Sequence, residues 1–81
     1  MTITVRLFAV ARDAAGTDSL TLCLPAGATT ADVASMLAER HHPLARVLPS
    51  CAFAVNQQYA PPTTALRDGD EVAVIPPVSG G

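Results

Sequence analysis

The segment that could most readily do chemistry is the end of the chain, which reads Pro76-Pro77-Val78-Ser79-Gly80-Gly81. The two prolines favour an extended polyproline conformation, which would hold the end of the chain away from a folded domain. Gly80 and Gly81 carry no side chains and adopt dihedrals closed to other residues, so the terminal carboxylate could enter a narrow tunnel in another protein. The pattern favours a reactive carboxylate used in a partner's site. An ordinary frayed terminus is the alternative.

Histidines and cysteines give weaker candidate sites. His41 and His42 are adjacent, so on a helix their rings diverge by about 100° and cannot hold one metal ion. Cys23 and Cys51 are too few for a disulfide scaffold or a metal site. Neither has a nearby cation or a helix N-terminus to lower its pKa, so we expect inert thiols. A persulfide or redox role is the alternative.

The remaining polar groups do not form a catalytic set. Asp68-Gly69-Asp70-Glu71 lacks the ligand spacing of a calcium loop and predicts a turn before a strand. No Ser, Cys or carboxylate has a neighbour in the sequence that would activate it as a nucleophile. Phosphate-binding and dinucleotide-binding glycine loops are also absent from the sequence. We therefore expect no bound cofactor or metal.

Length and composition point the same way. Eighty-one residues suffice for one core and one sheet. The formal net charge of −2 argues against a nucleic-acid partner. No apolar run approaches the roughly 20 residues of a membrane helix, and no signal peptide opens the sequence. We expect a cytoplasmic protein with no membrane partner.

Two alternating segments predict the first strands. In Thr2–Val10, Ile3, Val5 and Leu7 fall on one phase, as expected for a half-buried strand. Ser19–Leu24 alternates again, with its three leucines on one phase. Gly16 ends the short alanine-rich connection between them. We expect antiparallel neighbours in one sheet.

A single main helix is predicted next. Thr29 or Thr30 can cap it, Asp32 suits its first turn, and Pro43 stops it shortly after His41 and His42. Leu44–Pro49 could add a helical turn. The helix must cover the apolar face of the sheet, since no other element is available to do so.

The rest of the chain completes a mixed sheet. Ala52–Val55 and Glu71–Ile75 predict strands, and Pro61-Pro62 permits a short edge piece near Tyr59. A helical crossover joins the first and last strands, which should therefore be parallel and adjacent. We predict an α+β fold of the ubiquitin-like β-grasp type, with about five strands, a domain over 1–75 and a tail over 76–81.

Three apolar residues do not fit the core. Phe8 and Ile75 fall on the phase opposite to the core residues of their strands. If those strands are parallel, both lie on the face that the helix leaves open, at the base of the tail. Tyr59 could join them from the edge piece. We interpret the three as a partner-binding surface, with a loop folded over them as the alternative.

These segments resemble one family, the small subunits of molybdopterin synthase. The resemblance spans nearly the whole chain and depends on Val5–Ala9, Ala15–Thr17, Ala54–Gln57 and, above all, Leu66–Gly81, LRDGDEVAVIPPVSGG. That last run is more similar to the molybdenum-cofactor branch than to the thiamine branch. The resemblance implies that a partner activating enzyme adenylates the Gly81 carboxylate with ATP. A persulfide donor then supplies the sulfur that makes a thiocarboxylate.

The resemblance also implies where the sulfur goes. The tail would enter the large synthase subunit, in a heterotetramer of two small and two large chains, and give its sulfur to the cyclic pyranopterin monophosphate precursor. Phe8, Tyr59 and Ile75 match the docking face, Gly80 and Gly81 the reactive end, and Pro76, Pro77, Val78 and Ser79 the segment that positions it. This chain would thus be a carrier and co-substrate, and an enzyme only as part of the synthase complex.

Two other functions stay open at this stage. One is a ubiquitin-like modifier, or a carrier for thiamine, cysteine or tRNA thiolation, which would use the same acyl-adenylate chemistry. The other is an interaction domain whose glycine ending is incidental. An iron–sulfur ferredoxin is excluded because two cysteines cannot supply four ligands.

Overall fold

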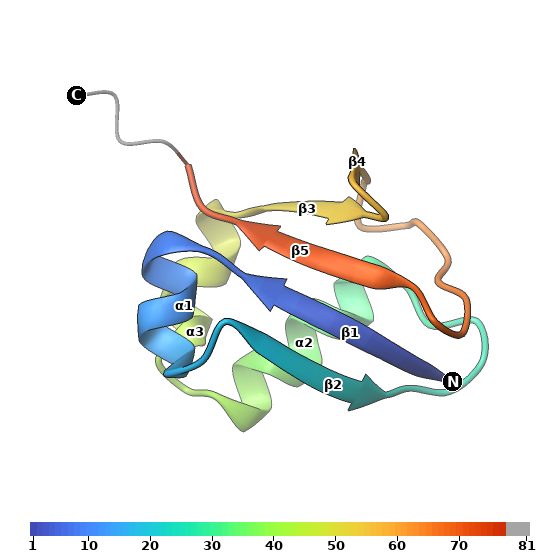
Figure 1. Cartoon of the computed structure of the whole chain (residues 1–81), viewed down its shortest axis with the longest axis horizontal. Coiled ribbons are helices and arrows are strands. Elements are labelled where there is room, and N and C mark those ends of the chain that lie inside the picture. The colour runs from blue at the N-terminus through green and yellow to red at the C-terminus, as the bar shows by residue number, and fades with distance from the viewer. Residues whose placement is uncertain (78–81) are drawn as a thin grey trace.

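Two parallel central strands organise the sheet. The computed structural model describes residues 1–77. In it β1 (Thr2–Leu7) pairs antiparallel with β2 (Ser19–Cys23) and parallel with β5 (Glu71–Ile75). On its other side β5 pairs antiparallel with β3 (Ala52–Val55), and the short β4 (Gln58–Tyr59) forms the edge. The order β2-β1-β5-β3-β4, visible in Figure 1, confirms the predicted β-grasp arrangement.

The alternation of each strand decides which face is buried. The inward phase of β1, β2 and β5 supplies the centre of the core, in which every member is at most 2% exposed: Ile3, Val5, Leu7, Leu22, Val72 and Val74. Two helices, α2 (Thr30–Arg40) and α3 (Leu44–Val47), lie behind the sheet in Figure 1 and cover this face. The other face is left open, as the sequence predicts.

The main helix is α2 (Thr30–Arg40), and its start is fixed by local hydrogen bonds. The backbone N–H and the hydroxyl of Thr29 both donate to the carboxylate of Asp32, at 2.8 and 3.2 Å. That carboxylate also complements the positive end of the helix dipole. Val33 and Leu37 carry the apolar stripe into the core. The predicted cap and the predicted acid in the first turn are therefore confirmed.

The first strand is shorter than its alternation predicts. It ends at Leu7, and Ala9 has a φ of 50°, in the left-handed region that residues with a Cβ rarely adopt. The short helix α1 (Ala9–Ala15) follows and ends at Gly16, whose φ is 76°. The alternation wrongly extends the strand because alanine fits the periodicity of a strand and of a helix equally well. In the helix, Ala11 is fully buried and Ala9 is exposed.

Two further features complete the fold. The predicted helical turn after Pro43 is present as α3 (Leu44–Val47), followed by a 3₁₀ turn over Leu48–Ser50. The predicted turn at Asp68-Gly69 is also present, where the Thr2 N–H donates to Asp68 Oδ1 at 2.7 Å. Within residues 1–77, no helix combines the length and apolar character needed to cross a membrane.

Candidate functional site

The parallel pairing of β1 with β5 brings Phe8 next to Ile75. In that register Leu7 faces Val74, and Phe8, the first residue after β1, keeps an extended backbone that aligns it with Ile75. Phe8 is 44% exposed, and Ile75 is partly buried. Both lie where β1 and β5 end, and Pro76 continues the chain directly from Ile75. The predicted juxtaposition on the open face is confirmed.

Tyr59 joins these two residues from the edge of the sheet. It pairs with Ala54 of β3, and its side chain is 75% exposed. A shallow hollow of about 380 Å³ on the open face has Phe8, Tyr59 and Ile75 among its lining residues. We call these three residues the open-face cluster. Their common hollow makes them one surface.

Charged groups border the open-face cluster. Arg6 and Glu71 line the same hollow, with Nη1 and Oε2 3.9 Å apart and both side chains about two-fifths exposed. An exposed pair at this distance contributes little to stability. It gives the apolar surface a polar rim, an arrangement common at protein interfaces.

A tight turn holds Tyr59 in place. Asn56 and Gln57 have φ values of 48° and 72°, which let β3 reverse into β4 within two residues. The Asn56 side chain accepts from the Glu71 N–H and donates to Asp70 Oδ1, both at 3.0 Å. The hairpin is thereby tied to the start of β5. The site residues predicted from the sequence do not include Asn56, although an Asn between two apolar segments is a turn signal.

The C-terminal segment begins at this same end of the sheet. Pro76 is buried and Pro77 is exposed, and both line a groove next to Phe8 and Ile75. Val78, Ser79, Gly80 and Gly81 lie outside the described residues. Their predicted roles at the reactive end and in its positioning therefore remain predictions.

The cysteines show no sign of activation. Cys51 is partly buried, its Sγ donates to the carbonyl of Val47 at 3.2 Å, and burial raises the pKa of its thiol. A raised pKa keeps the thiol protonated and unreactive at neutral pH. Cys23 lies exposed on β2, and neither residue is in a disulfide. Among residues 1–77 no group of three or more His, Cys, Asp or Glu side chains could hold a metal ion.

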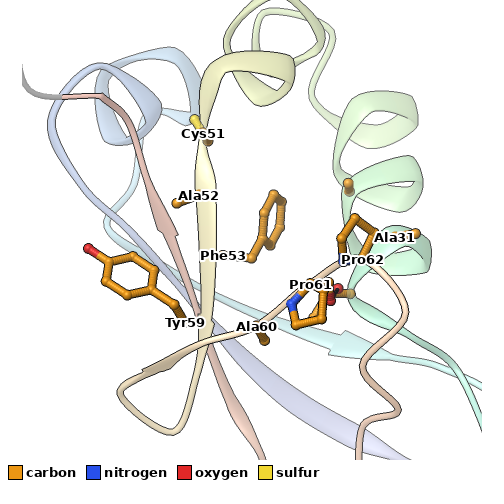
Figure 2. Close-up of a pocket in the computed structure, with 10 residues that line it drawn as sticks. Ala31, Cys51, Ala52, Phe53, Tyr59, Ala60, Pro61 and Pro62 are labelled. Atoms are coloured by element: carbon orange, nitrogen blue, oxygen red, sulfur yellow. Dashed lines mark hydrogen bonds between the residues drawn. The ribbon is translucent and has the colours of Figure 1, made fainter.

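A larger hollow lies between α2 and β3. It has a volume of about 600 Å³, and Figure 2 shows the Phe53 ring pointing into it while Tyr59 lies on the other side of β3. Ala31 and two prolines form much of its wall, and the Thr30 hydroxyl donates to the Pro61 carbonyl at 2.7 Å. These lining residues offer apolar surface and no acid–base pair, so the hollow is not a candidate active site.

Comparison with known proteins identifies the family. Residues 5–81 match the ThiS family. This chain belongs to the ThiS family. It is 46% identical over 83 residues to a molybdopterin synthase sulfur carrier subunit of Chlamydomonas reinhardtii, with all of both chains covered. It is 38% identical to the protein of the same name in Arabidopsis thaliana, covering 98% of this chain and 82% of that one.

Solved structures confirm the fold. SAMP1 of Haloferax volcanii, a small archaeal modifier protein, has a TM-score of 0.90 at 29% identity, with both chains fully covered. A putative molybdopterin converting factor subunit 1 of Pyrococcus furiosus has a TM-score of 0.88 at 31% identity, covering 96% and 99% of the two chains. A chain from the complex of molybdopterin-converting factor subunits 1 and 2 of Helicobacter pylori has a TM-score of 0.74 at 26% identity over the whole of both chains.

Proposed function

We propose that this chain is the sulfur carrier subunit of a molybdopterin synthase. The observation that carries the proposal is its identity of 46%, over the full length of both chains, to a sulfur carrier subunit of that enzyme. The structure supports it with an open-face cluster at the end of the sheet where the C-terminal segment leaves β5. A carrier needs both features, a reactive end and a surface that places that end in a partner.

The reacting group is the carboxylate of Gly81. One of its oxygens attacks the α-phosphorus of ATP in an activating enzyme, which releases pyrophosphate and leaves an acyl adenylate. The outer sulfur of a donor's persulfide then displaces AMP and forms an acyl disulfide, and a second thiol of the donor or the activating enzyme reduces the S–S bond, which releases the thiocarboxylate and leaves a protein disulfide. Because Gly80 and Gly81 have no side chains, the end of the chain can enter a narrower reaction site. ATP is thus consumed by the partner, and this chain holds no resident cofactor.

The sulfur is delivered inside a second partner. The H. pylori complex joins subunits 1 and 2 of molybdopterin-converting factor, which supports a large subunit as the docking partner here. Phe8, Tyr59 and Ile75 contact that subunit, and Pro76 to Ser79 lead the end of the chain into its active site. The thiocarboxylate sulfur there displaces an oxygen substituent from a carbon of the cyclic pyranopterin monophosphate precursor, and water then cleaves the acyl–sulfur bond, which leaves the sulfur on the precursor and restores the Gly81 carboxylate. Two loaded carriers, held in a heterotetramer of two small and two large subunits, supply the two dithiolene sulfurs.

This chain is therefore a co-substrate, and the synthase complex is the sulfurtransferase. The described residues of this chain support a carrier role without catalysis. The hollow beside Phe8, Tyr59 and Ile75 is shallow, and the Arg6–Glu71 pair that lines it is exposed. The enclosed, water-free site that such chemistry needs must come from the large subunit.

Removal of Gly81 tests the proposal. A chain that ends at Gly80 should keep its melting temperature, because the core elements lie within residues 1–75. It should yield no molybdopterin when combined with the large subunit, the activating enzyme, ATP, a sulfur donor and the precursor. Replacement of Ser35, an exposed residue of α2, by Ala is the matched control and should retain full conversion. Conversion by the shortened chain would contradict the proposal.

Protein modification is a second candidate function. The similarity to SAMP1, a small archaeal modifier protein, favours it, since a modifier uses the same adenylated C-terminus. A carrier for thiamine, cysteine or tRNA thiolation would also share this chemistry. Isopeptide adducts between Gly81 and lysines of other proteins would support a modifier. All five cationic side chains here are Arg, so no adduct on a lysine of a second copy can form.

A further inference from the structure

A second apolar surface lies around the corner from the open-face cluster. It is a groove of about 670 Å³ where β5 ends, bounded by the first residues of α1, by the end of α3 with the 3₁₀ turn after it, and by the start of the C-terminal segment. Its lining includes Val10, Val47, Pro76 and Pro77, together with Phe8 and Ile75. We call it the exit groove. Because it shares Phe8 and Ile75 with the open-face cluster, the two surfaces are continuous.

Val10 is the residue that distinguishes the exit groove. Its side chain is 54% exposed, more than that of Phe8. Within residues 1–77 the exposed large hydrophobic side chains are Phe8, Val10 and Tyr59, and two of these three line the exit groove. Exposed apolar groups that gather in one place mark interaction surfaces far more often than isolated ones do.

The backbone between Phe8 and Val10 is held in an unfavourable conformation. Ala9 has a φ of 50°, although it is not a glycine. Such a residue persists only where the surrounding structure fixes it, and these positions gather at functional sites. Here the left-handed residue follows the end of β1, so that Phe8 stays beside the open face while Val10, in the first turn of α1, lies at the exit groove. The chain thus presents two neighbouring apolar side chains to two adjoining surfaces.

The length of the remaining chain limits how far a partner can lie from this groove. Four residues follow Pro77, and at about 3.5 Å per residue they reach at most about 14 Å. If the Gly81 carboxylate reacts inside a partner, that partner's surface must come within this distance of Pro77. Pro77 is itself part of the exit groove, so the groove lies within the same distance of the partner's surface. This step rests on the proposed function.

We infer that the exit groove is a second contact site for the large synthase subunit. Its occupant is an apolar surface of that subunit beside the entrance to its tail-binding cleft. A stable interface uses about 20–30 residues on each side, more than the eight that line the open-face hollow, so the contact must extend beyond it. The exit groove is the continuous apolar extension, and Val10 is its exposed contact.

Replacement of Val10 by Arg tests this inference. The charged side chain cannot be buried without a partner, so the affinity of the unmodified carrier for the recombinant large subunit should fall by at least about tenfold in calorimetry. Ala31→Arg is the matched control, because Ala31 is an exposed helical residue that lines the other apolar hollow, between α2 and β3. That variant should bind like the wild type. Circular dichroism and melting curves show whether both variants fold. If Val10→Arg does not fold, Val10→Ser replaces it, because this smaller change should still weaken binding.

The other outcomes would overturn the inference. Wild-type affinity of the folded Val10 variants, an equal loss in Ala31→Arg, or an effect confined to the activating enzyme would each show that the large subunit does not contact the exit groove. Failure of the proposed function is distinguishable, because then the wild-type chain itself would not bind the large subunit.

Discussion

At the scale of single residues, Phe8, Tyr59 and Ile75 act through exposed apolar surface. Phe8 and Tyr59 are 44% and 75% exposed, and Ile75 lies partly buried beside them. Burial of this surface against a partner releases water and stabilises the complex. Aromatic residues in the centre of an interface often account for much of its binding energy. Phe8 is the strongest candidate, since it lines both the open-face hollow and the exit groove.

Phe8→Arg should therefore weaken docking. We expect a loss of about 2–4 kcal/mol in the binding free energy for the large subunit, since the variant removes an aromatic contact and adds a charge. Isothermal titration calorimetry measures it. Thr21→Arg is the control, because Thr21 is exposed on the edge strand β2, whereas Tyr59 lies on the other edge strand, β4. This variant should keep wild-type affinity. Equal affinities for wild type and Phe8→Arg would place the interface elsewhere.

Cys51 should take no part in sulfur transfer. Burial raises the pKa of its thiol above the usual value of 9.0, so the folded protein holds this proton more tightly than the unfolded chain does. The resulting stabilisation is fully present below about pH 9 and is lost as the pH rises through the folded-state pKa. At pH 8 Cys51 should be alkylated more slowly in the native protein than in urea, as peptide mass spectrometry can show. Equal rates would contradict a partly buried thiol that stays protonated.

At the scale of elements, the sequence predicts those parts whose signals are local and redundant. The cap at Thr29, the acid at Asp32 and the stop at Pro43 together define α2. The start of α1 has no such signal, because a helix of seven residues is marginal by itself. It is held by tertiary packing, with Ala11 fully buried. For the same reason Val10 does not stand out in the sequence, since the alternation over Thr2–Val10 makes it a strand residue.

The cap of α2 offers a test at this scale. Asp32→Ala removes the acceptor for two hydrogen bonds from Thr29 and a negative charge at the helix N-terminus. We expect the free energy of unfolding to fall by about 1 kcal/mol, measured by urea denaturation. Glu39→Ala is the matched control, because it removes an exposed acid from the last turn of the same helix, where the dipole disfavours it. Equal losses in the two variants would rule out a capping role.

At the scale of the whole molecule, stability and docking use opposite faces of one sheet. The covered face holds the core, whereas the open face and the exit groove meet where β5 ends. The sequence predicts this division because strand phase and the right-handed crossover are global constraints. Neither constraint predicts the exit groove. That surface depends on the left-handed turn at Ala9 and on the packing of α1 against α3, which no periodicity encodes.

Leu22→Ala should lower the stability of the domain without weakening its binding to the large subunit. Leu22 is 2% exposed in the core, so a cavity there should lower the free energy of unfolding by roughly 2–5 kcal/mol. That is a large share of the stability of a domain this small. Below its lowered melting temperature the variant should still bind the large subunit, because Leu22 faces away from the docking surfaces. A loss of binding by the folded variant would contradict the separation of the two faces.

The central claim is that Gly81 carries sulfur, and the mass of the C-terminal peptide tests it most directly. The chain is incubated with its activating enzyme, ATP and a sulfur donor, and the peptide that contains Gly81 is then measured by mass spectrometry. The account predicts that one terminal oxygen is replaced by sulfur, and only when ATP is present. An unmodified Gly81, under conditions in which the large subunit still converts the precursor, would contradict it.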